Sequence, residues 1–151
     1  MRKIKIPDPV GHDQPVEYRR KPRILVVDDE PEVAAALRDL IEYEGFRVET
    51  AENGRQALHY LKRGRRFDLI ITDMNMPEMD GLELIRRVRQ LKKNLPVIVL
   101  TGYATFKSGL EAIREGVYDY VSKPFSVNLL MNVVHEALRD KRRSRRNTVK
   151  E

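Results

Sequence analysis

The chain has 151 residues, of which 34% are charged and 41% hydrophobic, and this length suits a single domain with one compact core. It contains no cysteine, which excludes zinc fingers, iron–sulfur clusters, thiol catalysis and a disulfide-stapled secreted fold. No apolar run is long enough for a membrane span or a signal peptide, so we expect a soluble, cytoplasmic protein.

The net charge of +6 is concentrated at the two ends of the sequence. Residues 1–22 carry six basic and three acidic side chains, and residues 139–151 carry seven and two. Residues 23–138 carry sixteen and eighteen, which makes the body slightly acidic. Such a body argues against a domain built around a phosphate-backbone groove. Nucleic acid is therefore not an expected partner within this chain, and any such role would belong to the tails.

The order of predicted elements indicates an α/β fold. Residues 1–22 hold four of the eight prolines and few periodic apolar positions, so we expect an extended N-terminal arm there. Short β-branched runs then predict five strands, at residues 23–27, 46–50, 67–72, 96–100 and 117–121. Each interval between them suits one crossover helix, which predicts a five-stranded parallel sheet with five helices over residues 23–138. A basic C-terminal tail, residues 139–151, follows.

Several residues mark the ends of the predicted helices. Pro31 suits the first turn of the first helix. Gly45, Gly64 and Gly116 suit the C-terminal caps of the first, second and fourth helices. Ser126 can cap the fifth helix at its N-terminus.

Polar side chains follow four of the predicted strands at the points where these strands end. Asp28 and Asp29 follow the first strand, Asp73 the third and Thr101 the fourth, and Lys123 lies just beyond the fifth. Ligands of open parallel sheets bind at the carboxyl ends of the strands. We therefore expect these five side chains to converge on one edge of the sheet.

This set of side chains has a definite chemistry. Three converging carboxylates repel one another unless one is protonated or a cation lies among them. An all-oxygen cluster with few protein ligands favours Mg²⁺. With a lysine and a hydroxyl opposite, the cluster is suited to phosphoryl transfer, in which Asp73 would be the nucleophile and form an acyl phosphate.

Four motifs carry a resemblance to a known family. They are VDDE at residues 27–30, TDMNMPEMDG at 72–81, LTGY at 100–103 and YVSKPF at 120–125. In this order they resemble the receiver domain of two-component response regulators, and the resemblance covers about residues 23–138. It implies a flavodoxin-like doubly wound sheet of strand order 2-1-3-4-5. It also implies a phosphorelay protein, rather than an enzyme, that catalyses only its own phosphorylation and dephosphorylation.

The resemblance also implies the residues of the phosphorylation site. Asp73 would accept a phosphoryl group from a histidine kinase or phosphotransfer protein. Asp28, Asp29, Asp73 and the main-chain carbonyl of Asn75 would hold Mg²⁺, with Asp28 acting largely through metal-bound water.

Further roles concern the phosphoryl group and the response to it. By resemblance, Thr101, Lys123 and the main-chain amides of Met74 and Gly102 would bind the phosphoryl group. Thr101 and Tyr120 would be switch residues, although Tyr120 could simply pack. The expected output is a surface of the fourth helix, fifth strand and fifth helix, through which a homodimer could form. The Lys123–Pro124 bond is usually cis in this family.

Two alternative functions differ from this interpretation. Haloacid-dehalogenase-type phosphatases also combine a nucleophilic Asp with a Thr or Ser, a Lys and magnesium, but they carry an acidic residue where this chain has Asn75. A nucleic-acid-binding regulator could use the basic run at residues 141–146, which is more simply a solvated helix end or the start of a linker. The chain is expected to be a stand-alone receiver or a fragment of a longer regulator. The methionines near Asp73 are interpreted as adaptable packing, and the three histidines as surface or boundary residues.

Overall fold

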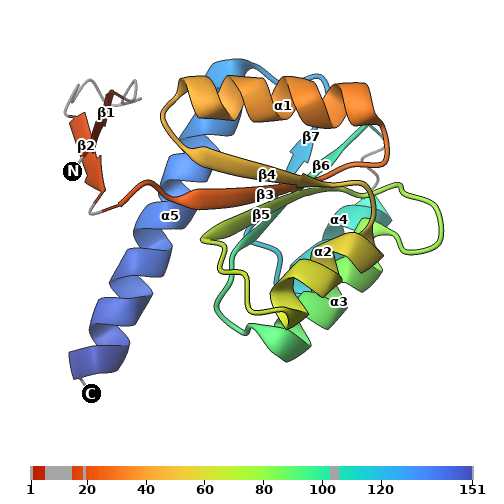
Figure 1. The fold of residues 1–151 in the computed structure, drawn as a ribbon. Coiled ribbons are helices and arrows are strands. Elements are labelled where there is room, and N and C mark those ends of the chain that lie inside the picture. The colour runs from red at the N-terminus through yellow and green to blue at the C-terminus, as the bar shows by residue number, and fades with distance from the viewer. Residues whose placement is uncertain (1, 6–14, 19, 103–105, 151) are drawn as a thin grey trace.

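The structure is a computed structural model that describes residues 2–5, 15–18, 20–102 and 106–150, with side chains described for 20–102 and 107–141. Its centre is a parallel sheet of five strands that pair in the order β4-β3-β5-β6-β7 (Figure 1). Counted within this sheet, the order is 2-1-3-4-5, which confirms the predicted topology. The strands are β3 (Arg23–Val27), β4 (Arg47–Ala51), β5 (Leu69–Asp73), β6 (Val97–Thr101) and β7 (Asp119–Ser122).

Helices cover both faces of the sheet. On one face lie α1 (Pro31–Tyr43) and α5 (Val127–Lys150), and on the other lie α2 (Gly54–Lys62), α3 (Gly81–Leu91) and α4 (Phe106–Arg114) (Figure 1). Each face has its own apolar cluster, because alternate strand residues point to opposite sides. This explains why β6 is buried along its whole length and reads as a continuous apolar run.

The strand register aligns the polar strand ends. Val27 of β3 lies opposite Thr72 of β5, so Asp28 and Asp73 both follow directly at the same edge. Asp73 in turn lies opposite Leu100 of β6, which places Thr101 one step beyond. The carboxyl edge of the sheet therefore gathers the residues that the sequence predicted to converge.

The predicted helix ends are confirmed. Gly45, Gly64 and Gly116 have φ values of 102°, 84° and 85°, a left-handed conformation that glycine adopts without steric cost. Pro31 opens α1, and the Ser126 hydroxyl accepts a hydrogen bond of 3.0 Å from the amide of Leu129 at the start of α5. The three glycines end α1, α2 and α4, after which the chain turns back toward the sheet.

Some details differ from the sequence prediction. Within the first 22 residues, where we expected an extended arm, β1 (Arg2–Lys5) and β2 (Pro15–Tyr18) pair as an antiparallel two-stranded sheet. Helix α5 continues to Lys150, so residues 139–150 of the basic segment lie within a helix instead of beginning after one. None of the helices in the described part of the chain is both long and apolar enough to cross a bilayer.

Candidate functional site

Three carboxylates meet at the carboxyl edge of the sheet. Asp28 and Asp29 follow β3, Asp73 ends β5, and one carboxylate oxygen from each lies within 4.8 Å of the others. Asp28 is only 4% exposed, and its Oδ1 accepts a hydrogen bond of 2.9 Å from the amide of Glu30. Asp29 and Asp73 are partly exposed, so the cluster opens toward solvent on one side.

The electrostatics of this cluster leave negative charge uncompensated. Burial raises the pKa of the Asp28 and Asp73 carboxyls above their ordinary value, and the neighbouring carboxylates raise it further. The ammonium of Lys123 acts against this shift in pKa, with its Nζ 3.8 Å from Oδ1 of Asp73. One lysine faces three carboxylates, so a bound cation would stabilise the ionised cluster.

The donor set fits a small hard cation. All three side chains offer oxygen, and their spacing allows one ion to contact them together, directly or through water. Asn75 lies two residues after Asp73 in the same loop and is exposed. Asp28, Asp29 and Asp73, the residues predicted to hold Mg²⁺ with their side chains, are therefore brought together.

Thr101, Lys123 and Met74, which were predicted to bind a phosphoryl group, lie at the same edge of the sheet as Asp73. Thr101 is fully buried at the end of β6, and its carbonyl accepts a hydrogen bond of 2.7 Å from the amide of Lys123. The Lys123–Pro124 peptide bond is cis, as expected. The amide of Met74 donates to Oδ1 of Asp73 at 3.0 Å and to the carbonyl of Leu100 at 3.3 Å.

The third motif, LTGY, continues with two residues after Thr101. Gly102 follows Thr101 and is exposed. Tyr103, the last residue of the third motif, lies outside the described residues.

The loop after Asp73 approaches the start of α3 closely. The amide of Gly81 donates a hydrogen bond of 2.8 Å to the carbonyl of Met74. A Cβ atom at Gly81 would lie 2.6 Å from the carbonyl oxygen of Asp73 and 2.9 Å from Cα of Met74. Both neighbours are backbone atoms, so only glycine fits here without moving the phosphoacceptor candidate.

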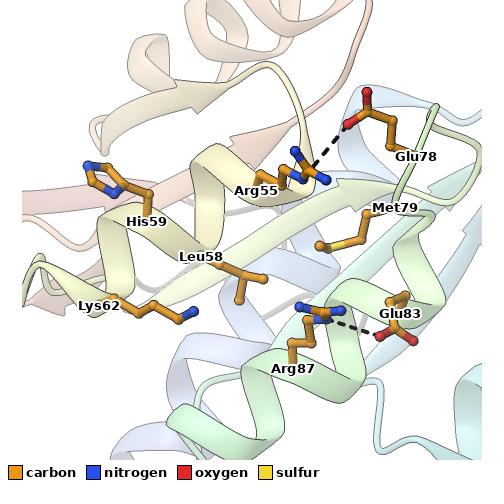
Figure 2. A pocket seen from close by; sticks show the side chains of 8 residues that line it. All are labelled: Arg55, Leu58, His59, Lys62, Glu78, Met79, Glu83 and Arg87. Carbon is orange, nitrogen blue, oxygen red and sulfur yellow. Dashed lines mark hydrogen bonds and ion pairs between the residues drawn. The ribbon is translucent and has the colours of Figure 1, made fainter.

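The same loop is anchored to α2 and α3. Glu78 adopts a left-handed φ of 66°, a conformation that the sequence did not predict for a glutamate. Its carboxylate lies 3.8 Å from Nε of Arg55, while the buried Met79 points between the two helices (Figure 2). These residues line a groove of about 380 Å³ between α2 and α3. The interpretation of Met79, and of the buried Met74 and Met76, as packing residues is confirmed.

Tyr120 lies on β7, beside α4. Its ring is partly buried against the apolar cluster under α2 and α3, and its hydroxyl lies 2.8 Å from Oγ of Ser108 on α4. The structure therefore shows Tyr120 as a packed residue that also links α4 to β7.

One histidine was interpreted wrongly. His135 on α5 is 1% exposed and packs against Phe46 with ring centroids 5.2 Å apart, so it belongs to the core. Burial, and then the charge of Arg139, lower the pKa of His135 to about 4. His59 is exposed as expected, and His12 lies outside the described residues.

Comparison with known proteins is consistent across sequence and structure. A profile described as the response regulator receiver domain matches residues 24–135. The regulatory protein AtoC of Escherichia coli (strain K12) is 41% identical over 116 residues, which cover 77% of this chain and 25% of AtoC. A 14.6 kDa protein encoded in the sodA1 3′ region of Leptolyngbya boryana is 44% identical over 115 residues, covering 75% of this chain and 87% of that protein. The CheY-like receiver domain protein of Methanospirillum hungatei JF-1 superimposes with a TM-score of 0.79 at 27% identity, covering 83% and 99% of the two chains.

The chain belongs to the response regulator receiver domain family. Receiver domains are regulatory, and the predicted flavodoxin-like doubly wound sheet is confirmed by the strand order. The chain spans about a quarter of the length of AtoC and of the related transcriptional regulatory proteins ZraR.

Proposed function

We propose that this receiver accepts one phosphoryl group on Asp73, from a histidine kinase or phosphotransfer protein in the cytoplasm. One observation carries the proposal: three carboxylates lie within 4.8 Å of one another, and Nζ of Lys123 lies 3.8 Å from Oδ1 of Asp73. Asp73 is the phosphoacceptor because it is the carboxylate nearest the lysine and is partly open to solvent.

Mg²⁺ is the proposed cofactor. Asp28, Asp29 and Asp73 would hold it together with the main-chain carbonyl of Asn75, Asp28 acting mainly through water. Bound there, the ion would neutralise charge on the phosphoryl oxygens.

The chain's own residues carry out the transfer. An oxygen of Asp73 attacks phosphorus and forms an O–P bond, while the bond from phosphorus to the donor's imidazole nitrogen breaks and its electron pair returns to the donor. Lys123 loses its ion pair with the Asp73 carboxylate and pairs with a phosphoryl oxygen instead. The Thr101 hydroxyl and the amides of Met74 and Gly102 donate to the remaining oxygens.

The phosphatase alternative is disfavoured by one residue. A phosphate-ester hydrolase of this type needs a general acid two residues after the nucleophile, and here the side chain is the amide of Asn75, which does not supply a proton. The Asp28–Asp29 pair also has no role in that mechanism. The protein would then catalyse only its own phosphorylation and dephosphorylation.

The output face would consist of α4, β7 and α5. Thr101 and Tyr120 would be the switch residues, since Thr101 ends β6 beside the site and Tyr120 links β7 to Ser108 on α4. A homodimer through this face is the proposed consequence of phosphorylation.

Phosphorylation by acetyl phosphate tests the proposal. The whole chain is treated with acetyl phosphate and Mg²⁺, and its intact mass is measured. Wild type is expected to gain one phosphoryl group, and Asp73→Asn none. Asp80→Asn is the matched control, because Asp80 also belongs to this loop but caps α3 through the amide of Glu83. Equal labelling of Asp73→Asn and wild type would show the assignment to be wrong.

A further inference from the structure

A second charged surface lies at the opposite edge of the sheet from Asp73. It is a groove of about 350 Å³, which we call the basic groove, lined by Gly64 and six basic side chains: Arg20, Lys21, Arg23, Arg47, Arg65 and Arg66. The residues that line it include no acidic side chain. Such a concentration of positive charge attracts a negatively charged ligand.

The fold brings these cations together from three separate segments. The first segment leads into β3, the second is the start of β4, and the third is the loop between α2 and β5. Arg23 and Arg47 lie opposite each other at the first register position of the parallel pair. The groove therefore lies at the amino edge of the sheet, whereas the carboxylates lie at the carboxyl edge.

Asp68 fixes one wall of the basic groove. Its carboxylate accepts a hydrogen bond of 2.9 Å from the amide of Arg23, and it forms ion pairs of 3.5 Å with both Arg20 and Lys141. Lys141 belongs to α5 and also donates to the carbonyl of Phe67 at 3.3 Å. Helix α5 is thus joined to this edge at Lys141, and its backbone continues to Lys150 through a sequence with four further arginines, at positions 142, 143, 145 and 146.

Much of the positive charge in the groove is not neutralised by the described side chains. Arg65 pairs with Glu49 at 2.7 Å and lies 4.6 Å over the ring of Tyr60. By contrast, Lys21, Arg23, Arg47 and Arg66 form no ion pair with any described side chain, and Arg47 and Arg66 are exposed. These two arginines are available to an external anion.

The lining chemistry selects the class of ligand. Pockets for small molecules are lined mainly by apolar side chains, and surfaces that insert into lipid carry aromatic or aliphatic residues. The basic groove has neither, because its lining consists of arginine, lysine and one glycine. We propose that the basic groove binds the sugar-phosphate backbone of duplex DNA without sequence preference.

The placement of the groove makes this binding independent of the phosphorylation chemistry. The carboxylates follow the carboxyl ends of β3 and β5, whereas the basic groove is lined at the amino ends of β3 and β4, so the DNA phosphates are held away from the acidic site. A variant can therefore lose DNA binding and keep phosphorylation of Asp73, or the reverse. The expectation from the sequence that nucleic acid is not a partner rested on charge along the chain, and the fold changes how that charge is distributed on the surface.

Fluorescence anisotropy with a labelled DNA duplex of about two helical turns tests the proposal on the whole chain. Binding of wild type is expected to weaken linearly in a plot of log affinity against log salt. The double variant Arg47→Gln/Arg66→Gln should bind about tenfold more weakly at low salt, with a salt slope smaller by about 2. The matched control is Lys107→Gln/Arg114→Gln on α4, which removes the same charge from exposed positions and should keep wild-type affinity. Acetyl phosphate labelling of Asp73 shows that both variants are folded.

Several results would overturn the proposal. Equal losses in the two double variants would mean that only net charge matters. Failure of wild type to bind DNA, or competition for the duplex by inorganic phosphate at low millimolar concentration, would exclude a backbone site. Tighter binding to phosphatidylglycerol vesicles than to DNA, lost in Arg47→Gln/Arg66→Gln, would assign the groove to a membrane surface.

Discussion

At the scale of single residues, the position of Asp73 depends on a glycine as well as on the acidic cluster. Gly81 allows the start of α3 to contact the backbone of Asp73 and Met74. Glycine is required at position 81 because a side chain would not fit, and not because of an unusual φ. The atoms nearest to an added Cβ belong to the main chain and cannot rotate away. A change at Gly81 therefore tests how tightly the phosphoacceptor loop is held.

We expect Gly81→Ala to destabilise the protein by about 1–3 kcal/mol and to slow phosphorylation of Asp73, because the added methyl group displaces the loop. Thermal or urea unfolding and the rate of labelling by acetyl phosphate measure the two effects. Gly109→Ala on α4 is the control, because among the described residues a Cβ at Gly109 would meet only the ring of Tyr120, at 4.0 Å, which is ordinary van der Waals contact. Equal stability and equal labelling of the two variants would contradict the close approach.

His135 introduces a pH dependence that originates in the core. Its pKa is about 4 in the folded protein, below the ordinary value of 6.5. The stability associated with neutral His135 is fully present above pH 6.5 and is lost as the pH falls from 6.5 toward 4, because the unfolded chain takes up the proton first.

We expect the free energy of unfolding of wild type to fall between pH 6.5 and 4 by about 3 kcal/mol more than that of His135→Leu. Urea unfolding at several pH values gives the two curves. The variant is not required to match the wild-type stability, because the comparison concerns only the slopes. Parallel curves would mean that His135 remains protonated or accessible in the folded protein.

The sequence predicted the location of those site residues that follow a predicted strand. Asp28, Asp73, Thr101 and Lys123 could be found because each follows a recognisable strand. His135 could not, because its polar side chain lies within an apolar helical stripe whose burial depends on contact with Phe46, a distant residue. The left-handed Glu78 was also missed, since its conformation is imposed by the loop that joins Asp73 to α3.

At the scale of elements, α4 and β7 are linked by the contact between Tyr120 and Ser108. If this pair belongs to the switch, addition of beryllofluoride should change amide hydrogen exchange in α4 and β7, and Thr101→Ala should weaken the change. The physical reason is that a phosphoryl mimic accepts a hydrogen bond from the Thr101 hydroxyl, which alters the packing beside β7. Exchange that changes only around Asp73 would mean that Thr101 and Tyr120 are packing residues.

The positive charge of residues 139–151 does not mark where the domain ends within α5. Asp140 accepts a hydrogen bond of 2.6 Å from the Tyr118 hydroxyl, and burial with this bond raises the pKa of Tyr118. Lys141 is tied to Asp68 and Phe67. The segment 139–151, defined from the sequence as a tail, therefore begins with residues that contact the domain.

We expect removal of residues 139–151 to lower stability by about 1–3 kcal/mol, whereas removal of 143–151 leaves both contacts and stability nearly unchanged. Phosphorylation of Asp73 should survive both truncations. Unfolding curves and intact mass after acetyl phosphate treatment provide the readouts. Loss of labelling on removal of 143–151 would show that the end of α5 supports the site.

At the scale of the whole molecule, the fold separates two kinds of charge. The crossover pattern was predictable, because five apolar strands with regular intervals allow few other arrangements, and it placed the acidic cluster correctly. The basic groove was not predictable, since Arg23, Arg47 and Arg66 are spread over more than forty positions and meet only through the register of β3 and β4 and the loop before β5.

The predicted strand boundaries differ from those in the structure by one or two residues at four of the five strands. The reason is that main-chain pairing, rather than side-chain type, decides where a strand begins.

The central claim is that Asp73 alone carries the phosphoryl group. Borohydride reduces an aspartyl phosphate to homoserine, so peptide mass spectrometry of the reduced protein identifies the modified position directly. After treatment with acetyl phosphate and Mg²⁺, we predict homoserine at position 73 and at no other aspartate, with none formed when the metal is chelated. Homoserine at position 28 or 29, or equal conversion of Asp73 without Mg²⁺, would contradict the account.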